Sequence, residues 1–247
     1  MQCGVINFKG SLFKGAMWMS ICSAFEPAGG LFEGVECAIF DLDGTLVRSD
    51  SAWKSVDEEF MGRRGLKVPD GFYDKISTMN LSQAADYVIA ECGIRATRQE
   101  VVDEWLSMVR REYAEVIPMV TGAKEFLSRV HDKGCKIALA TASSPELYLP
   151  CLERHGVAKL FDAYANTSEV KRKKGFPDIY LLAADKVGAN PQKCVVFEDI
   201  YLGCVGAKAA GMKCIGITEE SPDSIQKLKT VCDLAVKDYS ELKIYLQ

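Results

Sequence analysis

The chain has 247 residues, of which 48% are hydrophobic and 26% are charged, and its formal net charge is -4. This composition is typical of an ordinary globular protein with one large domain, or with a domain that carries an insert. The acidic balance, and the lack of a basic stripe with interleaved aromatic side chains, argue against nucleic acid as a partner. No apolar run approaches the roughly 20 residues of a membrane span, so we expect a cytoplasmic protein with no membrane partner.

The N-terminal segment differs from the rest of the chain. It combines two lysines with a mildly apolar run that serines interrupt. A secretory signal has a cleaner apolar core and a small-residue cleavage site. We therefore expect residues 1–34 to be an extension of unknown role outside the fold, or the product of an upstream start codon with Met17 or Met19 as the natural start.

Short apolar runs recur along the remaining sequence. Four of them lack the alternation of a half-buried strand, which predicts strands that are covered on both faces. They are VECAIF (35–40), KIALA (136–140), CVVF (194–197) and KCIGI (213–217). Helix candidates with glycine stops at Gly134, Gly156 and Gly188 precede the second and third of these runs. This alternation predicts an α/β fold with a Rossmann-like parallel sheet as its core.

The alternation stops between residues 49 and 118. Three apolar stripes at helical spacing occupy this interval, the first with Trp53, Val56 and Phe60 on one face. Thr97 and Glu100 have the spacing of a capping box at the start of the third stripe. A helical block of this length is too long for an ordinary crossover. We therefore predict a helical cap domain over 49–118, inserted into a core domain formed by 35–48 and 119–247.

The ten cysteines are scattered singly, and several lie at or beside the predicted strands. No pair has Cys-x-x-Cys spacing and the chain has two histidines, so a zinc site is not expected. We expect buried free thiols in a reducing compartment.

Polar side chains follow three of the predicted strands at the point where each strand ends. They are Asp41 and Asp43 after the first, Thr141 and Ala142 after the second, and Glu198 and Asp199 after the third. Lys174 lies just before a helix. Because ligands of an open parallel sheet gather at the carboxyl ends of its strands, we expect these groups to meet. Carboxylates this close repel one another unless a cation compensates them.

Phosphoryl transfer to an aspartate needs this set of groups. A carboxylate attacks phosphorus and forms an acyl phosphate that water later breaks. Because carboxylate and phosphate repel each other, a Mg²⁺ ion, which prefers oxygen ligands, has to lie between them. A second carboxylate two residues along the chain is suited to be the general acid and base. Hydroxyl, backbone N–H and lysine groups stabilise the transferring phosphoryl group.

Four separated motifs occur in order along the chain. They are DLDGT, ATASS, KGFPD and VVFEDIYLGCVGAKAAGM. Through them the chain, from about Val35 to Gln247, resembles the haloacid dehalogenase superfamily. The similarity is to the β-phosphoglucomutase-like phosphatase subgroup, whose members have a helical cap after the first strand. One such motif occurs by chance, whereas four in this order are specific.

The resemblance implies a role for each matching residue. Asp41 would be the nucleophile and a magnesium ligand. Asp43 would be the general acid and base, with its backbone carbonyl on the metal. Thr141 and Ala142 would bind the phosphate, and Lys174 would neutralise the charge of the nucleophile and the phosphate. Glu198 and Asp199 would bind magnesium.

The activity implied by the resemblance is hydrolysis of a phosphomonoester through an aspartyl-phosphate intermediate, with Mg²⁺ as the cofactor. The substrate would be a small phosphorylated metabolite, with sugar phosphates as the leading class. Asp43 favours this reaction, since dehalogenases of the superfamily lack an acid at that position. We expect a monomer or a weak dimer.

Two alternatives stay open. One is a hexose phosphomutase similar to β-phosphoglucomutase, which needs a basic cap residue for a second phosphate. Leu81 stands near the place where the family has an arginine for this purpose, although Arg63, Arg64 and Lys67 offer other basic groups. The other alternative is a non-catalytic protein that binds phosphorylated metabolites.

Three residues depart from the family pattern. Arg48 stands where many relatives have an aspartate, Gly175 replaces a common proline after the lysine, and Ile200 stands where serine or threonine is usual. None of them is a predicted catalytic group, so we expect activity to survive. The departures bear on substrate preference and on metal affinity, the latter through a lost hydrogen bond near the metal.

Overall fold

The computed structural model describes residues 31–49, 51–76, 79, 81–219 and 221–246. Most of the predicted N-terminal extension, residues 1–30, therefore lies outside the described residues. Phe32, from the end of that extension, is buried in the core. Within the described part of the chain, no helix has the length and apolar character needed to span a membrane.

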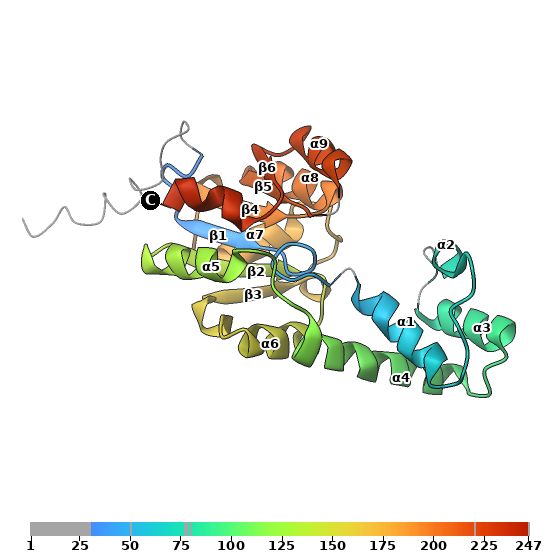
Figure 1. Ribbon diagram of the computed structural model, residues 1–247. Helices are drawn as coiled ribbons and strands as arrows, with labels where there is room; N and C mark the ends of the chain where they lie inside the picture. The colour runs from blue at the N-terminus through green and yellow to red at the C-terminus, as the bar shows by residue number, and fades with distance from the viewer. Residues whose placement is uncertain (1–30, 50, 77–78, 80, 220, 247) are drawn as a thin grey trace, which may run out of the picture.

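A sheet of six parallel strands forms the core of the molecule (Figure 1). In spatial order these are β3 (Ala163–Asn166), β2 (Lys136–Thr141), β1 (Cys37–Phe40), β4 (Cys194–Glu198), β5 (Lys213–Ile217) and β6 (Leu234–Val236). Ile39 of β1 lies opposite Ala138 on one side and Val196 on the other, so β1 has a partner strand on both edges. The predicted α/β fold with a Rossmann-like parallel sheet is confirmed.

Helices cover both faces of this sheet. They are α5 (Ala123–Asp132), α6 (Pro145–Arg154) and η5 (Tyr239–Leu246) on one face, and α7 (Asp178–Lys186), α8 (Tyr201–Ala209) and α9 (Pro222–Lys229) on the other. Phe40 and Phe197, from adjacent strands, stack with ring centroids 4.5 Å apart. Phe126 of α5 and Tyr239 pack on this stack. The aromatic cluster fixes the ends of β1 and β4 beneath α5.

Between β1 and β2 the chain forms a separate group of helices, which projects to one side of the core in Figure 1. They are α1 (Ala52–Gly62), α2 (Phe72–Ile76), α3 (Leu81–Cys92), α4 (Arg98–Arg111) and the π-helical turn η1 (Glu112–Val116). The predicted capping box opens α4, with Thr97 and Glu100 each accepting from the other's backbone N–H. The rings of Phe60 and Trp105, 5.3 Å apart, join α1 to α4. We propose that this group is the cap, with the domain boundaries predicted above.

Candidate active site

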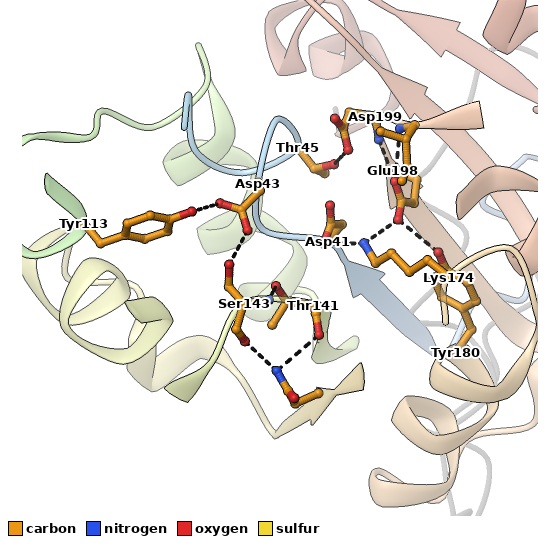
Figure 2. Close-up of polar contacts among 12 residues, drawn as sticks. Asp41, Asp43, Thr45, Tyr113, Thr141, Ser143, Lys174, Tyr180, Glu198 and Asp199 are labelled. Carbon is orange, nitrogen blue, oxygen red and sulfur yellow. Dashed lines mark hydrogen bonds and ion pairs between the residues drawn. The ribbon is translucent and has the colours of Figure 1, made fainter. Parts of the chain in front are cut away.

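The carboxyl ends of β1, β2 and β4 meet at one edge of the sheet (Figure 2). Asp41 directly follows β1, and its backbone N–H donates to the carbonyl oxygen of Phe197 over 3.0 Å. Thr141 ends β2 and Glu198 ends β4, and both are fully buried. The parallel topology therefore brings together groups that are more than 150 residues apart in the sequence.

Lys174 lies between two carboxylates. Its Nζ is 2.5 Å from Oδ1 of Asp41 and 2.5 Å from Oε1 of Glu198. Burial alone would lower the pKa of Lys174, but the two carboxylates together raise it above its ordinary value. The lysine is therefore held as a cation directly beside Asp41.

Glu198 is held by more than the lysine. Its Oε1 also accepts a hydrogen bond from the Tyr180 hydroxyl at 2.9 Å. Its Oε2 accepts from the backbone N–H groups of Asp199 at 3.0 Å and Ile200 at 3.2 Å. This buried carboxylate thus fixes the position of Lys174 and the shape of the turn that carries Asp199.

Gly203, in α8, leaves the room that Glu198 occupies. A Cβ atom at this position would lie 2.3 Å from the carboxyl carbon of Glu198. Four hydrogen bonds hold that carboxylate, so it has no free position to move into. We expect Gly203→Ala to lower kcat/KM by at least about tenfold and to cost about 1–3 kcal/mol of stability. Phosphate release and thermal unfolding measure the two effects.

Gly62→Ala is the matched control for this substitution. A Cβ atom at position 62 meets nothing within 4 Å, and the residue does not have a left-handed backbone. We expect kcat/KM of this variant to match the wild type. If Gly203→Ala kept the wild-type kcat/KM, this would contradict the role of Glu198 in fixing Lys174 and the turn that carries Asp199.

Asp199 contacts the loop that follows β1. Its Oδ1 accepts a hydrogen bond from the Thr45 hydroxyl at 3.3 Å. Gly44 has a φ angle of +76°, and a Cβ atom there would lie 2.2 Å from Oδ2 of Asp199. Only glycine meets both demands. The glycine of the DLDGT motif therefore leaves room for the Asp199 side chain, and the threonine holds it through a hydrogen bond.

Three carboxylates form a group suited to a divalent cation. Asp41, Glu198 and Asp199 each place an oxygen within 4.8 Å of the others. Burial raises the pKa of Asp41 to about 7 and that of Asp199 to about 9; neighbouring carboxylates add to both shifts, and Lys174 opposes them. One lysine does not balance three carboxylates, and carboxylate oxygens are the ligands that Mg²⁺ prefers. These residues therefore fit Mg²⁺, whereas the backbone carbonyl of Asp43 stays a predicted ligand.

The side chain of Asp43 turns towards the cap (Figure 2). It accepts hydrogen bonds from the Tyr113 hydroxyl and, at 2.6 Å, from Oγ of Ser143. Burial and the Asp43 carboxylate raise the pKa of Tyr113, so its hydroxyl keeps the proton that it donates. Tyr113 was not predicted, because it lies in η1, 70 residues from Asp43, within a stretch that carries no motif.

The predicted phosphate-binding residues form a turn at the end of β2. Oγ1 of Thr141 accepts a hydrogen bond from the Ser143 N–H at 3.0 Å, and Ala142 is exposed. Asn166, at the end of β3, donates from Nδ2 to the carbonyl oxygen of Ser143 at 2.5 Å. Asn166 thus supports the turn from the neighbouring strand, and it was missed because β3 itself was not predicted.

Two of the three departures from the family pattern, Gly175 and Ile200, are next in sequence to residues of the site, Lys174 and Asp199. Arg48 donates hydrogen bonds to Glu219 and to Thr121, and both distances are 2.6 Å. These contacts do not involve the carboxylate group. Gly175 has a φ angle of +105°, which proline cannot adopt. Ile200 occupies the N-cap position of α8 and supplies no side-chain hydrogen bond there. Serine or threonine at that position is suited to cap the helix.

Three thiols also meet, on the face of the sheet covered by α8. The sulfur atoms of Cys204, Cys214 and Cys232 lie within 4.8 Å of one another. The Cys214 and Cys232 sulfurs are 3.8 Å apart, and the cysteines of the described ranges are free. Spacing along the chain gave no sign of this group, because its members come from a helix, a strand and a loop. They pack together within the apolar layer on this face of the sheet.

These features of fold and site define a class of protein. A sequence model of haloacid dehalogenase-like hydrolases matches residues 38–217, which is well over half of the chain. The chain belongs to the haloacid dehalogenase-like hydrolase family.

Individual relatives refine the comparison. Hexitol phosphatase B of Escherichia coli (strain K12) is 27% identical over 211 residues, which is 81% of this chain and 95% of the relative. The phosphorylated carbohydrates phosphatase of Thermotoga maritima is 28% identical over 72% of this chain and 83% of its own. A solved structure from Thermotoga maritima, provisionally described as a beta-phosphoglucomutase, has a TM-score of 0.77 and 26% identity, covering 85% of this chain and 98% of that one. The predicted superfamily and its β-phosphoglucomutase-like subgroup are confirmed.

Proposed function

We propose that the protein is a magnesium-dependent phosphomonoester hydrolase that transfers a phosphoryl group first to Asp41 and then to water. The observation that carries this proposal is the contact of Asp41 with Lys174 inside a group of three carboxylates. The broader class rests on the family and on relatives that are named as phosphatases. The protein is a hydrolase of phosphoric monoesters.

Each charged group has a task in this proposal. Asp41 attacks phosphorus, and Lys174 offsets the charge of both the nucleophile and the phosphate. A Mg²⁺ ion bound by Asp41, Glu198 and Asp199 would supply the further positive charge that lets an anionic phosphate approach a carboxylate. Without that charge, the repulsion among these groups opposes substrate binding.

Asp43 has the position of a group that moves protons. Tyr113 and Ser143 orient its carboxylate, so that it gives a proton to the leaving oxygen and later takes one from the attacking water. Thr141 and Ala142 are proposed to bind the phosphate oxygens, through the hydroxyl of the former and the turn that both residues form after β2.

A small phosphorylated metabolite, with sugar phosphates as the leading class, is the proposed substrate. The relatives named for hexitols and for phosphorylated carbohydrates support this class. Leu81 lines a cavity in the cap, and no lysine or arginine of the described residues lines it. Arg63 and Arg64 instead form ion pairs with Glu59 and Glu104. Among the described residues, neither the cavity wall nor these two paired arginines therefore offers a free basic group to a second phosphate, which favours hydrolysis over the phosphomutase alternative.

A substrate panel tests the proposal. Purified protein is incubated with phosphorylated sugars, nucleotides and glycolytic acids, with magnesium or with a chelator, and released phosphate is measured. We expect one or a few sugar phosphates to be hydrolysed, and the chelator to reduce release to background. Isomerisation of β-glucose 1-phosphate without net phosphate release would indicate the mutase. No release from any ester would contradict the hydrolase and favour the non-catalytic binder.

A further inference from the structure

The helices of the cap line an open cavity of about 650 Å³. Its wall includes Trp53 and Asp57 of α1, Tyr73 of α2 and Trp105 of α4. A volume of this size suits a small organic ligand. We call it the cap cavity.

Two polar groups on this wall have no partner among the residues that the structure describes. Asp57 is 5% exposed, and within the described ranges it forms no hydrogen bond and no ion pair. The indole N–H of Trp105 is buried and likewise has no acceptor. Buried polar groups in proteins are almost always hydrogen-bonded. A ligand would have to offer a cation or a donor to Asp57 and an acceptor, such as a hydroxyl oxygen, to the Trp105 N–H.

The carboxyl group of Asp57 is the only acid among the described residues that line the cavity. Burial raises its pKa to about 7, and the neighbouring charge of Glu58 adds to the increase. A cation in the cavity would favour the ionised carboxylate. A neutral hydroxyl group would instead pair with the protonated carboxyl group, so the preference for charged or neutral ligands decides between the two.

Aromatic side chains surround this acid. Trp53 precedes Asp57 by one turn of α1, and Tyr73 and Trp105 come from two other helices. Trp53 is 42% exposed and Tyr73 is 38% exposed, so both rings are partly open to solvent. Aromatic rings attract cations through their faces, and a ligand ammonium is the group that such walls recognise.

We propose that the cap cavity binds an ammonium group on the organic part of the substrate, with Asp57 as its counter-ion. This inference rests on the proposed function and names the substrate class within it: phosphate monoesters whose alcohol part carries a primary amine or a quaternary ammonium. The position of α1 supports it. This helix begins shortly after Asp43, and in Figure 1 its first residues are its end nearest the core. The proposal places the phosphate of such a substrate at Asp41 and its other end in the cap.

Matched pairs of esters test the charge preference. Choline phosphate is compared with 3,3-dimethylbutyl phosphate, which has the same shape without the charge, and glucosamine 6-phosphate with glucose 6-phosphate. We expect kcat/KM to favour the cationic member of at least one pair by about tenfold or more. The pair that responds distinguishes a quaternary ammonium from a primary amine. Ratios within about twofold of one in both pairs, with phosphate released, overturn the inference and leave the proposed function standing.

Two neighbouring substitutions locate the effect. Asp57→Asn keeps the shape of the side chain and removes its charge, so we expect the ratio to fall towards one. Glu58→Gln is the matched control, because Glu58 is the next residue of the same helix and its side chain is 59% exposed. We expect the wild-type ratio in this control. An unchanged ratio in Asp57→Asn overturns the role of Asp57.

A binding measurement separates this inference from catalysis. Choline and glucosamine are titrated into the protein without magnesium, and the tryptophan fluorescence is followed, to which Trp53 and Trp105 of the cavity wall contribute. We expect saturable binding of at least one amine in the wild type and in Glu58→Gln, and its loss in Asp57→Asn. If no ester releases phosphate, the proposed function fails, yet saturable binding still supports the cavity. A wild type that binds neither amine overturns the inference.

Discussion

Asp41→Asn will abolish phosphate release and leave the fold intact. The amide is a poor nucleophile, so the step that forms the acyl phosphate is lost, and we expect kcat/KM to fall by at least about 10³-fold. The substitution keeps the shape of the side chain, and Lys174 retains Glu198 as an ion-pair partner at 2.5 Å. No buried charge is therefore left unpaired, and thermal unfolding will show a folded protein.

A chemical trap distinguishes loss of the nucleophile from loss of binding. After incubation with labelled acetyl phosphate and an acid quench, we expect the wild type to carry label and Asp41→Asn to carry none. Asp185→Asn, on the exposed end of α7, is the matched control and should retain full label. Full turnover in Asp41→Asn would exclude the covalent mechanism.

The central part of the fold could be predicted because its strands are covered on both faces. β1, β2, β4 and β5 consist almost entirely of buried residues, and each reads as a short apolar run. The two edge strands were not predicted. Ala163 and Tyr164 of β3 are only partly buried, and β6 has three residues. Their place in the sheet is set by pairing with a neighbouring strand, which a local sequence pattern does not record.

The same limit applies to the site. Asp41, Glu198 and Asp199 belong to motifs at the ends of predicted strands. The parallel topology alone therefore predicted that their side chains meet. Tyr180 and Asn166 act through contacts made across the fold, and nothing in their local sequence marks them. A sequence shows which groups end each strand, whereas the partners that orient them depend on the packing of helices and edge strands.

The apolar residues of α1 share one helical spacing but lie in two different environments. Val56 and Phe60 are fully buried and form the core of the cap, as their helical spacing predicts. Trp53 shares that spacing but lies on the wall of the cap cavity, beside Asp57. The cavity beside these first turns of α1 is also lined by residues of α2 and α3. Helical periodicity gives the face of a helix but not what that face meets.

Asp43→Asn will separate the two chemical steps. An alkyl or sugar leaving group needs a proton, so we expect kcat/KM for sugar phosphates to fall by about 10²–10⁴-fold. The p-nitrophenolate group leaves without a proton, so Asp41 should still be phosphorylated by p-nitrophenyl phosphate. Water is then no longer activated by Asp43, and the phosphorylated protein should accumulate.

Rapid-mixing kinetics detect this accumulation. With p-nitrophenyl phosphate, the variant should release a burst of nitrophenolate close to one equivalent of protein, followed by slow turnover, because loss of the base affects only the second step. The oxygen of asparagine can still accept a hydrogen bond from one of the two hydroxyls, and its NH2 group can donate to the other, so the geometry around position 43 is retained. Equal losses with both kinds of ester, and no burst, would mean that Asp43 acts through position or metal binding rather than as the acid and base. The leaving-group dependence therefore decides which role this second aspartate has.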